Sequence, residues 1–122
     1  MSKRMVEEDS LIILNENGEK LLSITEIFKE NTMFLMPKGS INMNVAPDFE
    51  DELIAAATIC NQIIVDFSGV DVISSAGIKA LLKVQRILDK REDSMLRLKA
   101  MKLEVYEMFE DMGFVDLFEI DK

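Results

Sequence analysis

The chain has 122 residues, 48% of them hydrophobic, which is enough for one compact core and too few for two ordinary domains. Its formal net charge of -9 opposes nucleic-acid binding, and no apolar run approaches the length of a membrane-spanning helix, so we expect no membrane insertion. Histidine is absent and Cys60 is the only cysteine, so the chain lacks the commonest general base and the usual transition-metal ligands. We therefore expect a cytoplasmic single domain over residues 1–122 that is not an enzyme and holds no cofactor or metal.

The first 38 residues combine short apolar runs with turn residues, a pattern typical of extended, hairpin-like structure. Leu11–Leu14 and Lys20–Ile24 predict two strands joined by the turn Asn-Glu-Asn-Gly at residues 15–18. A further apolar stretch, Met33–Met36, predicts another extended segment that ends at Pro37-Lys38-Gly39.

A helix is predicted to begin at Ala46-Pro47, because proline suits the first turn. The acidic residues that follow within 48–52 suit the positive end of the helix dipole. Its expected buried stripe consists of Phe49, Leu53, Ala56 and Ala57. The next segment, Gln62–Phe67, is apolar and rich in β-branched residues, so we expect the central strand of a sheet, buried on both faces.

A second helix is predicted after Ser74-Ser75-Ala76-Gly77, where serine is a favourable N-cap. Its expected apolar side consists of Ile78, Leu81, Val84 and Leu88. Met95–Ala100 then alternates as a half-buried strand does, with Leu96, Leu98 and Ala100 facing one way and Arg97 and Lys99 the other.

The last helix is expected from about Lys102 to Met112, ending at Gly113. Its apolar spacing is that of Val105, Met108, Phe109 and Met112. Leu117–Ile120 predicts a short final strand. Because strands alternate with helices, we expect an α/β fold with central parallel strands, an antiparallel N-terminal hairpin and helices packed on the mixed sheet.

Two segments resemble the STAS family. Residues 39–49 read GSINMNVAPDF, similar to the family pattern G-x-[IL]-D-x-x-[TN]-A-P-x-[FL]. Residues 64–82 read IVDFSGVDVISSAGIKALL, similar to VVDLSGVxFIDSSGLxxLL. With the Met-Gly-Phe of residues 112–114, the resemblance is strongest over residues 33–120 and implies a STAS-like sheet and a protein-binding function.

The resemblance is to anti-sigma factor antagonists, whose partner is both anti-sigma factor and serine kinase. It implies a regulatory domain that binds this partner and frees the sigma factor until a serine at the tip of the second segment is phosphorylated. The chain has Ala76 where the D-S-S-G form has that serine, and it resembles the I-S-S-A-G subset instead. Ser75 is then the first candidate for phosphorylation and Ser74 the second, while plain N-capping explains both hydroxyls equally well.

The resemblance also implies a partner-binding surface around the serines. Its candidate residues are Asn42, Ser74, Ser75, Ala76, Gly77, Lys79 and Lys83. The last two residues of this set belong to a basic stripe of Lys79, Lys83, Arg86 and Lys90, which suits either a solvated helix face or the docking of an acidic partner or neighbouring subunit. The alternative function is a constitutive STAS scaffold in a signalling or lipid-transport assembly, without a phosphorylation switch; the oligomeric state stays open.

Overall fold

The computed structural model describes residues 3–7 and 9–121. Its strands are β1 (Lys3–Glu7), β2 (Ser10–Leu14), β3 (Lys20–Lys29), β4 (Thr32–Ile41), β5 (Gln62–Asp66), β6 (Gly69–Ile73), β7 (Met95–Lys99) and β8 (Glu119–Asp121). Its helices are α1 (Ala46–Ile59), α2 (Ser75–Asp89) and α3 (Leu103–Asp111), followed by a 3-10 turn at Val115–Leu117. Within the described residues, no helix is long and apolar enough to cross a membrane.

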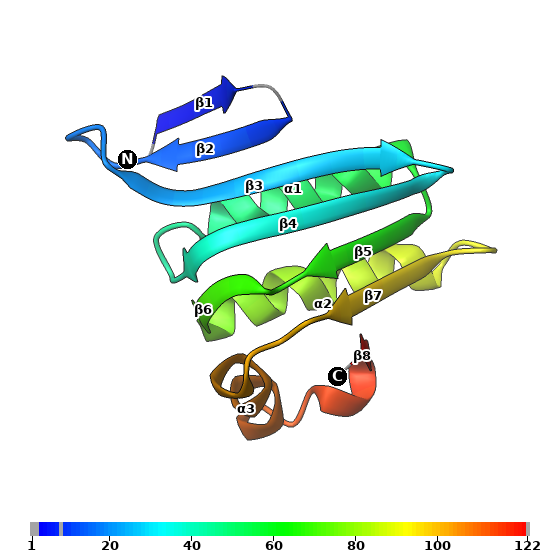
Figure 1. Cartoon of the computed structure of the whole chain (residues 1–122). Helices are drawn as coiled ribbons and strands as arrows, with labels where there is room; N and C mark the ends of the chain where they lie inside the picture. The colour runs from blue at the N-terminus through cyan, green and yellow to red at the C-terminus, as the bar shows by residue number, and fades with distance from the viewer. Residues whose placement is uncertain (1–2, 8, 122) are drawn as a thin grey trace.

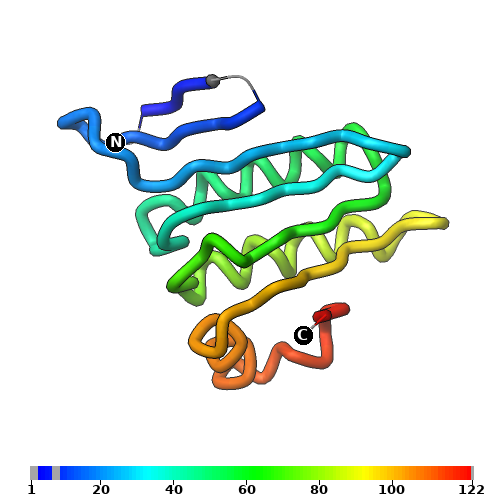
Figure 2. Tube along the Cα trace, in the orientation of Figure 1, coloured from blue at the N-terminus to red at the C-terminus, as the bar shows by residue number. Residues whose placement is uncertain are grey.

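The strands form one mixed sheet in the order β1-β2-β3-β4-β5-β7-β8, with β6 paired to the second half of β4. The first four strands pair antiparallel, and every pairing from β4 onward is parallel. Helices α1 and α2 cover the same face of this sheet, and α3 packs beside β6 (Figure 1). The chain trace places the N-terminal hairpin at one edge and the C-terminal segment at the other (Figure 2). The expected α/β fold is therefore confirmed.

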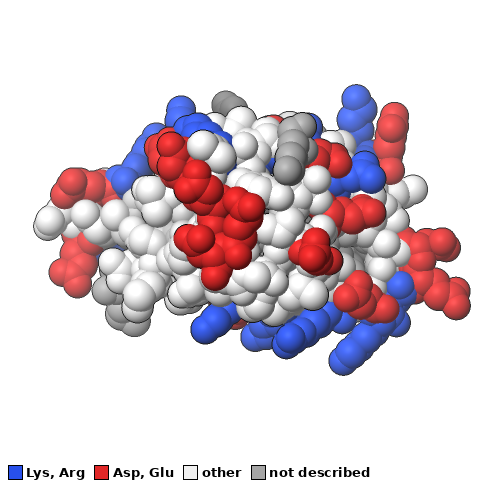
Figure 3. All heavy atoms as spheres, turned by 90° about the horizontal axis from the view of Figure 1, so that it is seen from below, with Lys and Arg blue, Asp and Glu red and all other residues white. Residues whose placement is uncertain are grey.

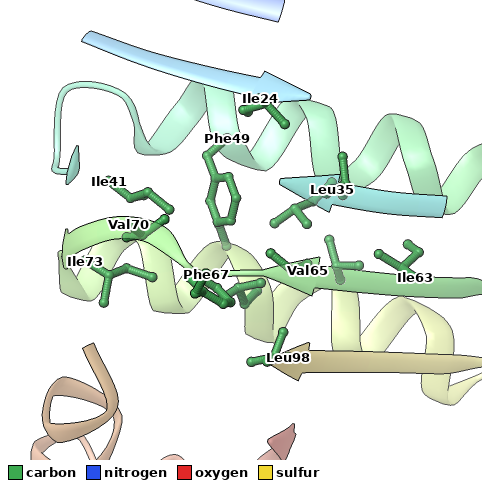
Figure 4. Packing of buried hydrophobic residues seen from close by; sticks show 14 of the residues in the cluster. Ile24, Leu35, Ile41, Phe49, Ile63, Val65, Phe67, Val70, Ile73 and Leu98 are labelled. Atoms are coloured by element: carbon green, nitrogen blue, oxygen red, sulfur yellow. The ribbon is translucent and has the colours of Figure 1, made fainter. Parts of the chain in front are cut away.

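The core lies between the sheet and the two helices. Phe49 points from α1 toward the sheet and belongs to the same buried cluster as Val65 of β5 and Phe67 (Figure 4). The central position of β5 is confirmed, since it pairs with β4 on one side and β7 on the other. The expectation that this strand is buried on both faces is wrong: Ile63 and Val65 are fully buried, but Ile64 is only half-buried, because the helices cover one face of the sheet only.

The strand predicted to end at Pro37 continues to Ile41, so that boundary is wrong. Proline normally interrupts a sheet because it lacks an N–H group. Here, however, the parallel partner of β4 changes from β5 to β6 at this position. The carbonyl oxygen of Pro37 lies on the side of Gly69, the first residue of β6, where an added Cβ atom would be 3.0 Å from it. The proline nitrogen thus faces the break between two partners, where a missing donor costs little.

Three smaller features differ from the sequence prediction. Ala100 does not continue the buried face of β7, because the strand ends at Lys99 and Ala100 is exposed with a φ of 60°. Met108 of α3 and Met112, the C-cap of this helix, are half-buried rather than buried, while Val105 and Phe109 are fully buried. The final strand begins two residues later than expected, after the 3-10 turn. The predicted helix end at Gly113 is confirmed by its φ of +72°.

Candidate functional site

Two loops meet at the carboxyl ends of β4 and β6. The parallel pairing of these strands aligns Ile41 with Ile73. The N–H of Ser74 donates to the carbonyl oxygen of Ile41 at 2.8 Å, extending this alignment by one residue. As a result, the loop that begins at Asn42 and the start of α2 lie next to each other, although Ile41 and Ile73 are 32 residues apart in the sequence.

Asn42 shapes the entry into α1. Its Oδ1 atom accepts hydrogen bonds from the backbone N–H groups of Asn44 at 2.9 Å and Val45 at 3.2 Å. Its carbonyl oxygen accepts from the N–H of Ala46 at 3.0 Å. Asn42 itself is exposed. The amide side chain therefore fixes the loop conformation while remaining at the surface beside α2.

Ser74 is the N-cap of α2. Its Oγ atom accepts from the N–H of Gly77 at 3.2 Å, and its carbonyl oxygen accepts from the N–H of Ile78 at 3.1 Å. This is the usual way in which a serine satisfies one of the free N–H groups of a helix start, and the predicted cap is confirmed. The half-buried Ser74 hydroxyl is thus already engaged in the fold.

Ser75 differs from Ser74 in its exposure and in its hydrogen bonding. It is the first residue of α2 and is exposed, and its hydroxyl has no hydrogen-bond partner within the described residues. It stands at the positive end of a 15-residue helix, where a negative group is stabilised by the helix dipole and by free N–H groups. Across the described chain, no group of His, Cys, Asp or Glu side chains is arranged to hold a metal ion.

Gly77 allows α2 to approach the sheet closely. A Cβ atom at this position would lie 2.8 Å from Cγ2 of Ile41 and 2.9 Å from Cγ1 of Ile73. Any larger residue must therefore displace two buried isoleucines, one from each strand that supports the site. Gly77 is buried, so it positions the helix start from beneath the surface.

Apolar side chains are exposed on the segments that adjoin the start of α2. A shallow hollow between the Asn42 loop and α2 is lined by Met43, Ala46, Pro47, Glu50 and Ala76. Met43 is 74% exposed, and Val72, at the end of β6, is 55% exposed. Sequence reasoning did not single out these two residues, although Met43 lies in the first motif segment. Exposed apolar side chains around a polar centre are typical of protein contact surfaces.

The two predicted basic residues lie further along α2. Lys79 and Lys83 are both exposed and follow Ser75 by one and two turns, which places them on its side of the helix. Nζ of Lys83 lies 3.5 Å from Oε2 of Glu50 on α1. The structure therefore brings Asn42, Ser75, Ala76 and Lys79 to one surface, with Ser74 and Gly77 beneath it as supports.

Comparison with known proteins agrees with this architecture. The sequence profile of the STAS domain family matches residues 23–122. An anti-sigma factor antagonist from Mycobacterium paratuberculosis is similar in structure, with a TM-score of 0.73 and 19% identity over 81% of this chain and 84% of that one. The Bacillus cell fate determinant SpoIIAA in its phosphorylated form gives 0.62 and 14%, over 81% and 91%.

A third similar structure is a sulfate transporter family protein from Wolinella succinogenes, with a TM-score of 0.64 and 20% identity over 77% of this chain and 79% of that one. At these identities the structural likenesses show the fold alone. A comparison with curated protein sequences finds no significant match.

Proposed function

The chain belongs to the STAS domain family, and from this premise we propose that it is a cytoplasmic regulatory domain that binds a serine-kinase anti-sigma factor and is released from it by phosphorylation of Ser75. In this proposal the chain acts by binding and catalyses no reaction itself. The unphosphorylated form holds the partner and frees the sigma factor. The kinase activity of the partner ends the complex by transferring the γ-phosphoryl group of ATP to the Ser75 oxygen, which loses its proton, with release of ADP.

The observation that carries the proposal is the division of roles between two adjacent serines. The Ser74 hydroxyl caps α2, whereas the neighbouring Ser75 hydroxyl is exposed at the same helix start. Modification of Ser75 therefore leaves the cap in place. This division favours Ser75 over Ser74 as the acceptor, because the Ser74 hydroxyl is half-buried and its oxygen already accepts the hydrogen bond from Gly77, whereas Ser75 is open to a kinase.

Electrostatics explains how such a modification separates binding from folding. A phosphoserine carries about -1.5 to -2 charges at neutral pH. At the first residue of α2 this charge meets the positive end of the helix dipole, so the fold tolerates it. In a contact surface that includes the exposed Met43 and Val72, the same charge must be desolvated when a partner binds. The phosphate therefore weakens the complex with the partner and leaves the fold stable. Control by phosphorylation is supported by the structural similarity to SpoIIAA, which has been solved in its phosphorylated form.

A second candidate function is a constitutive scaffold, in which the serines only shape the helix start. Two observations favour it. Ala76 stands directly before Gly77, where the D-S-S-G form of the family motif has its serine. One structurally similar chain belongs to a sulfate transporter family protein rather than to an anti-sigma factor antagonist.

The two functions are separated by substitutions at Ser75. The partner recovered with the chain from its native cells is titrated calorimetrically against the parent, Ser75→Ala and Ser75→Asp. We expect Ser75→Asp to weaken binding by at least about tenfold and Ser75→Ala to bind like the parent. Incubation with the partner and ATP should add one phosphate to the parent and none to Ser75→Ala, as measured by mass spectrometry.

A matched control is Asn61→Asp, which adds one negative charge at an exposed position before the amino end of β5, the opposite end of the strands. It should bind like the parent. If the parent gains no phosphate and all three variants bind equally, the switch is refuted and the scaffold function takes its place.

A further inference from the structure

A groove with a basic rim runs along the exposed side of α2. Its rim carries four cationic side chains, Lys79, Lys83, Arg86 and Lys90. All four are exposed and follow one another at intervals of four, three and four residues, so they form one row along the helix. The view from the side of α3 shows a row of basic side chains along the lower edge of the molecule and further basic groups at the upper edge, with acidic side chains over the middle of the face (Figure 3).

These four cationic side chains form few ion pairs within the described part of the chain. Within the described residues, Lys83 alone of the four has an ion-pair partner, Glu50 at 3.5 Å, and that pair is largely exposed. Like charges three and four residues apart on a helix destabilise it by about 0.2 to 0.5 kcal/mol per pair. These pairs oppose helix stability, while Arg86 and Lys90 at the end of α2 gain from the helix dipole. In a chain of net charge -9 such a row is not a consequence of general composition.

The floor of the groove is apolar. It is formed by Leu82 and Ile87 of α2 and by Phe114, which follows α3, all of them half-buried. Together with the rim and with Glu50 of α1 they line an open hollow of about 610 Å³. Lys79 and Lys90 are 11 residues apart, which corresponds to about 16 Å along the helix axis, or three helical turns.

We infer that this groove binds an acidic amphipathic helix of a protein partner. The apolar floor accepts the apolar side of such a helix, and the cationic rim pairs with its carboxylates. A length of three turns matches the row from Lys79 to Lys90. The inference goes beyond the proposed function, because it requires no modification of Ser75.

The distribution of charge argues against a larger anionic ligand. Four acidic residues, Glu104, Glu107, Glu110 and Asp111, are exposed on α3, whose C-terminal end leads into the groove residue Phe114. A membrane surface or a nucleic acid extends well beyond the groove and meets this negative charge. A short helix is confined to the basic row and avoids it.

The test uses the full chain and a synthetic three-turn peptide with leucines on one face and glutamates on the other, labelled for fluorescence anisotropy. We expect binding that weakens steeply with salt and falls at least about tenfold in Lys79→Gln/Arg86→Gln. The control Lys20→Gln/Lys29→Gln removes the same charge from exposed positions on β3 and should bind like the parent. Both variants are checked for unchanged folding by circular dichroism.

Four results would overturn the inference. The first is no peptide binding to the parent, and the second is equal binding of a scrambled peptide of the same composition, which indicates charge attraction alone. The third is binding of the groove to phosphatidylserine vesicles instead of the peptide. The fourth is self-association of the chain that is lost in Lys79→Gln/Arg86→Gln, which assigns the groove to a second copy. Because purified, unphosphorylated chain is used, none of these outcomes depends on whether the Ser75 switch exists.

Discussion

The Oγ atom of Ser74 accepts a hydrogen bond from the backbone N–H of Gly77 at 3.2 Å, whereas the hydroxyl of the next residue is exposed. Loss of an N-cap typically costs about 1 kcal/mol, and exposed substitutions cost less than about 0.5 kcal/mol. We therefore expect Ser74→Ala to lower the free energy of unfolding by about 1 kcal/mol and Ser75→Ala to leave it nearly unchanged, as measured by urea denaturation. Equal losses in the two variants would contradict the assignment of the cap.

Gly77 gives a second prediction about the same helix start. Alanine is a better helix former than glycine by about 1 kcal/mol, so Gly77→Ala would be stabilising on propensity alone. Its Cβ atom, however, would lie 2.8 Å from Ile41 and 2.9 Å from Ile73, and overpacking of a core costs about 1 to 3 kcal/mol. We expect a net loss of unfolding free energy in thermal or urea denaturation.

A double-mutant cycle isolates the steric cause. Ile73→Ala removes the Cγ1 atom that the new methyl group would meet. Gly77→Ala should therefore be less harmful in the Ile73→Ala background, with a coupling energy of about 0.5 kcal/mol or more. An additive cycle would mean that Gly77 is needed for some other reason.

Much of this site could be predicted from the sequence, because its signals are local. Ser74 precedes an amphipathic run, and such a serine caps a helix whatever the rest of the chain does. Gly113 likewise ends α3 through its own backbone conformation. The resemblance of residues 39–49 and 64–82 to the STAS family added the expectation that the Asn42 loop and the start of α2 form one surface. Local sequence patterns alone do not give this arrangement.

Features that depend on distant partners were not predictable in this way. The continuity of β4 through Pro37 depends on where β5 ends and β6 begins. The half-burial of Ile64 depends on both helices choosing the same face of the sheet. The acidic start of α1 was interpreted through the helix dipole alone, yet Asp48 is also buried against Arg4, 44 residues earlier in the chain.

Arg4 gives the third prediction. Its Nε donates to Oδ1 of Asp48 at 2.8 Å and its Nη2 to Oδ2 of Asp51 at 2.5 Å, which joins β1 to α1. Asp48 is buried while Arg4 is partly exposed, so the pair lies between the surface and buried cases. We expect Arg4→Gln to cost about 1 to 2 kcal/mol of unfolding free energy and to speed hydrogen exchange along β1 and β2.

The neighbouring Lys3→Gln is the matched control, since Lys3 is exposed on the same strand. It should change neither quantity measurably. Both β1 and β2 precede residue 23, where the match to the STAS profile begins. An Arg4→Gln variant as stable as the parent would mean that this N-terminal hairpin is held by its backbone pairing alone.

The last prediction concerns Glu26 of β3 and Glu52 of α1. Glu26 lies two residues after the fully buried Ile24, on the same face of the strand and under the helix layer. Burial, followed by the hydrogen bond and the charge repulsion that involve Glu52, raises the pKa of Glu26 from 4.5 to about 7. The folded chain thus holds a proton here that the unfolded chain releases at lower pH.

The raised pKa of Glu26 determines whether the free energy of unfolding rises or falls with pH. Between pH 4.5 and about 7 the folded chain binds more protons at Glu26 than the unfolded chain, so the free energy of unfolding falls as pH rises through this window and the full penalty is present above it. Glu26→Gln removes the penalty, and because the site is partly exposed we expect a gain of only about 1 kcal/mol at pH 8 and almost none at pH 4. The measurement is urea denaturation at a series of pH values, with the exposed Glu107→Gln of α3 as a control whose curve should follow the parent. A gain from Glu26→Gln that is the same at pH 4 and pH 8 would show that packing, and not proton binding, is responsible.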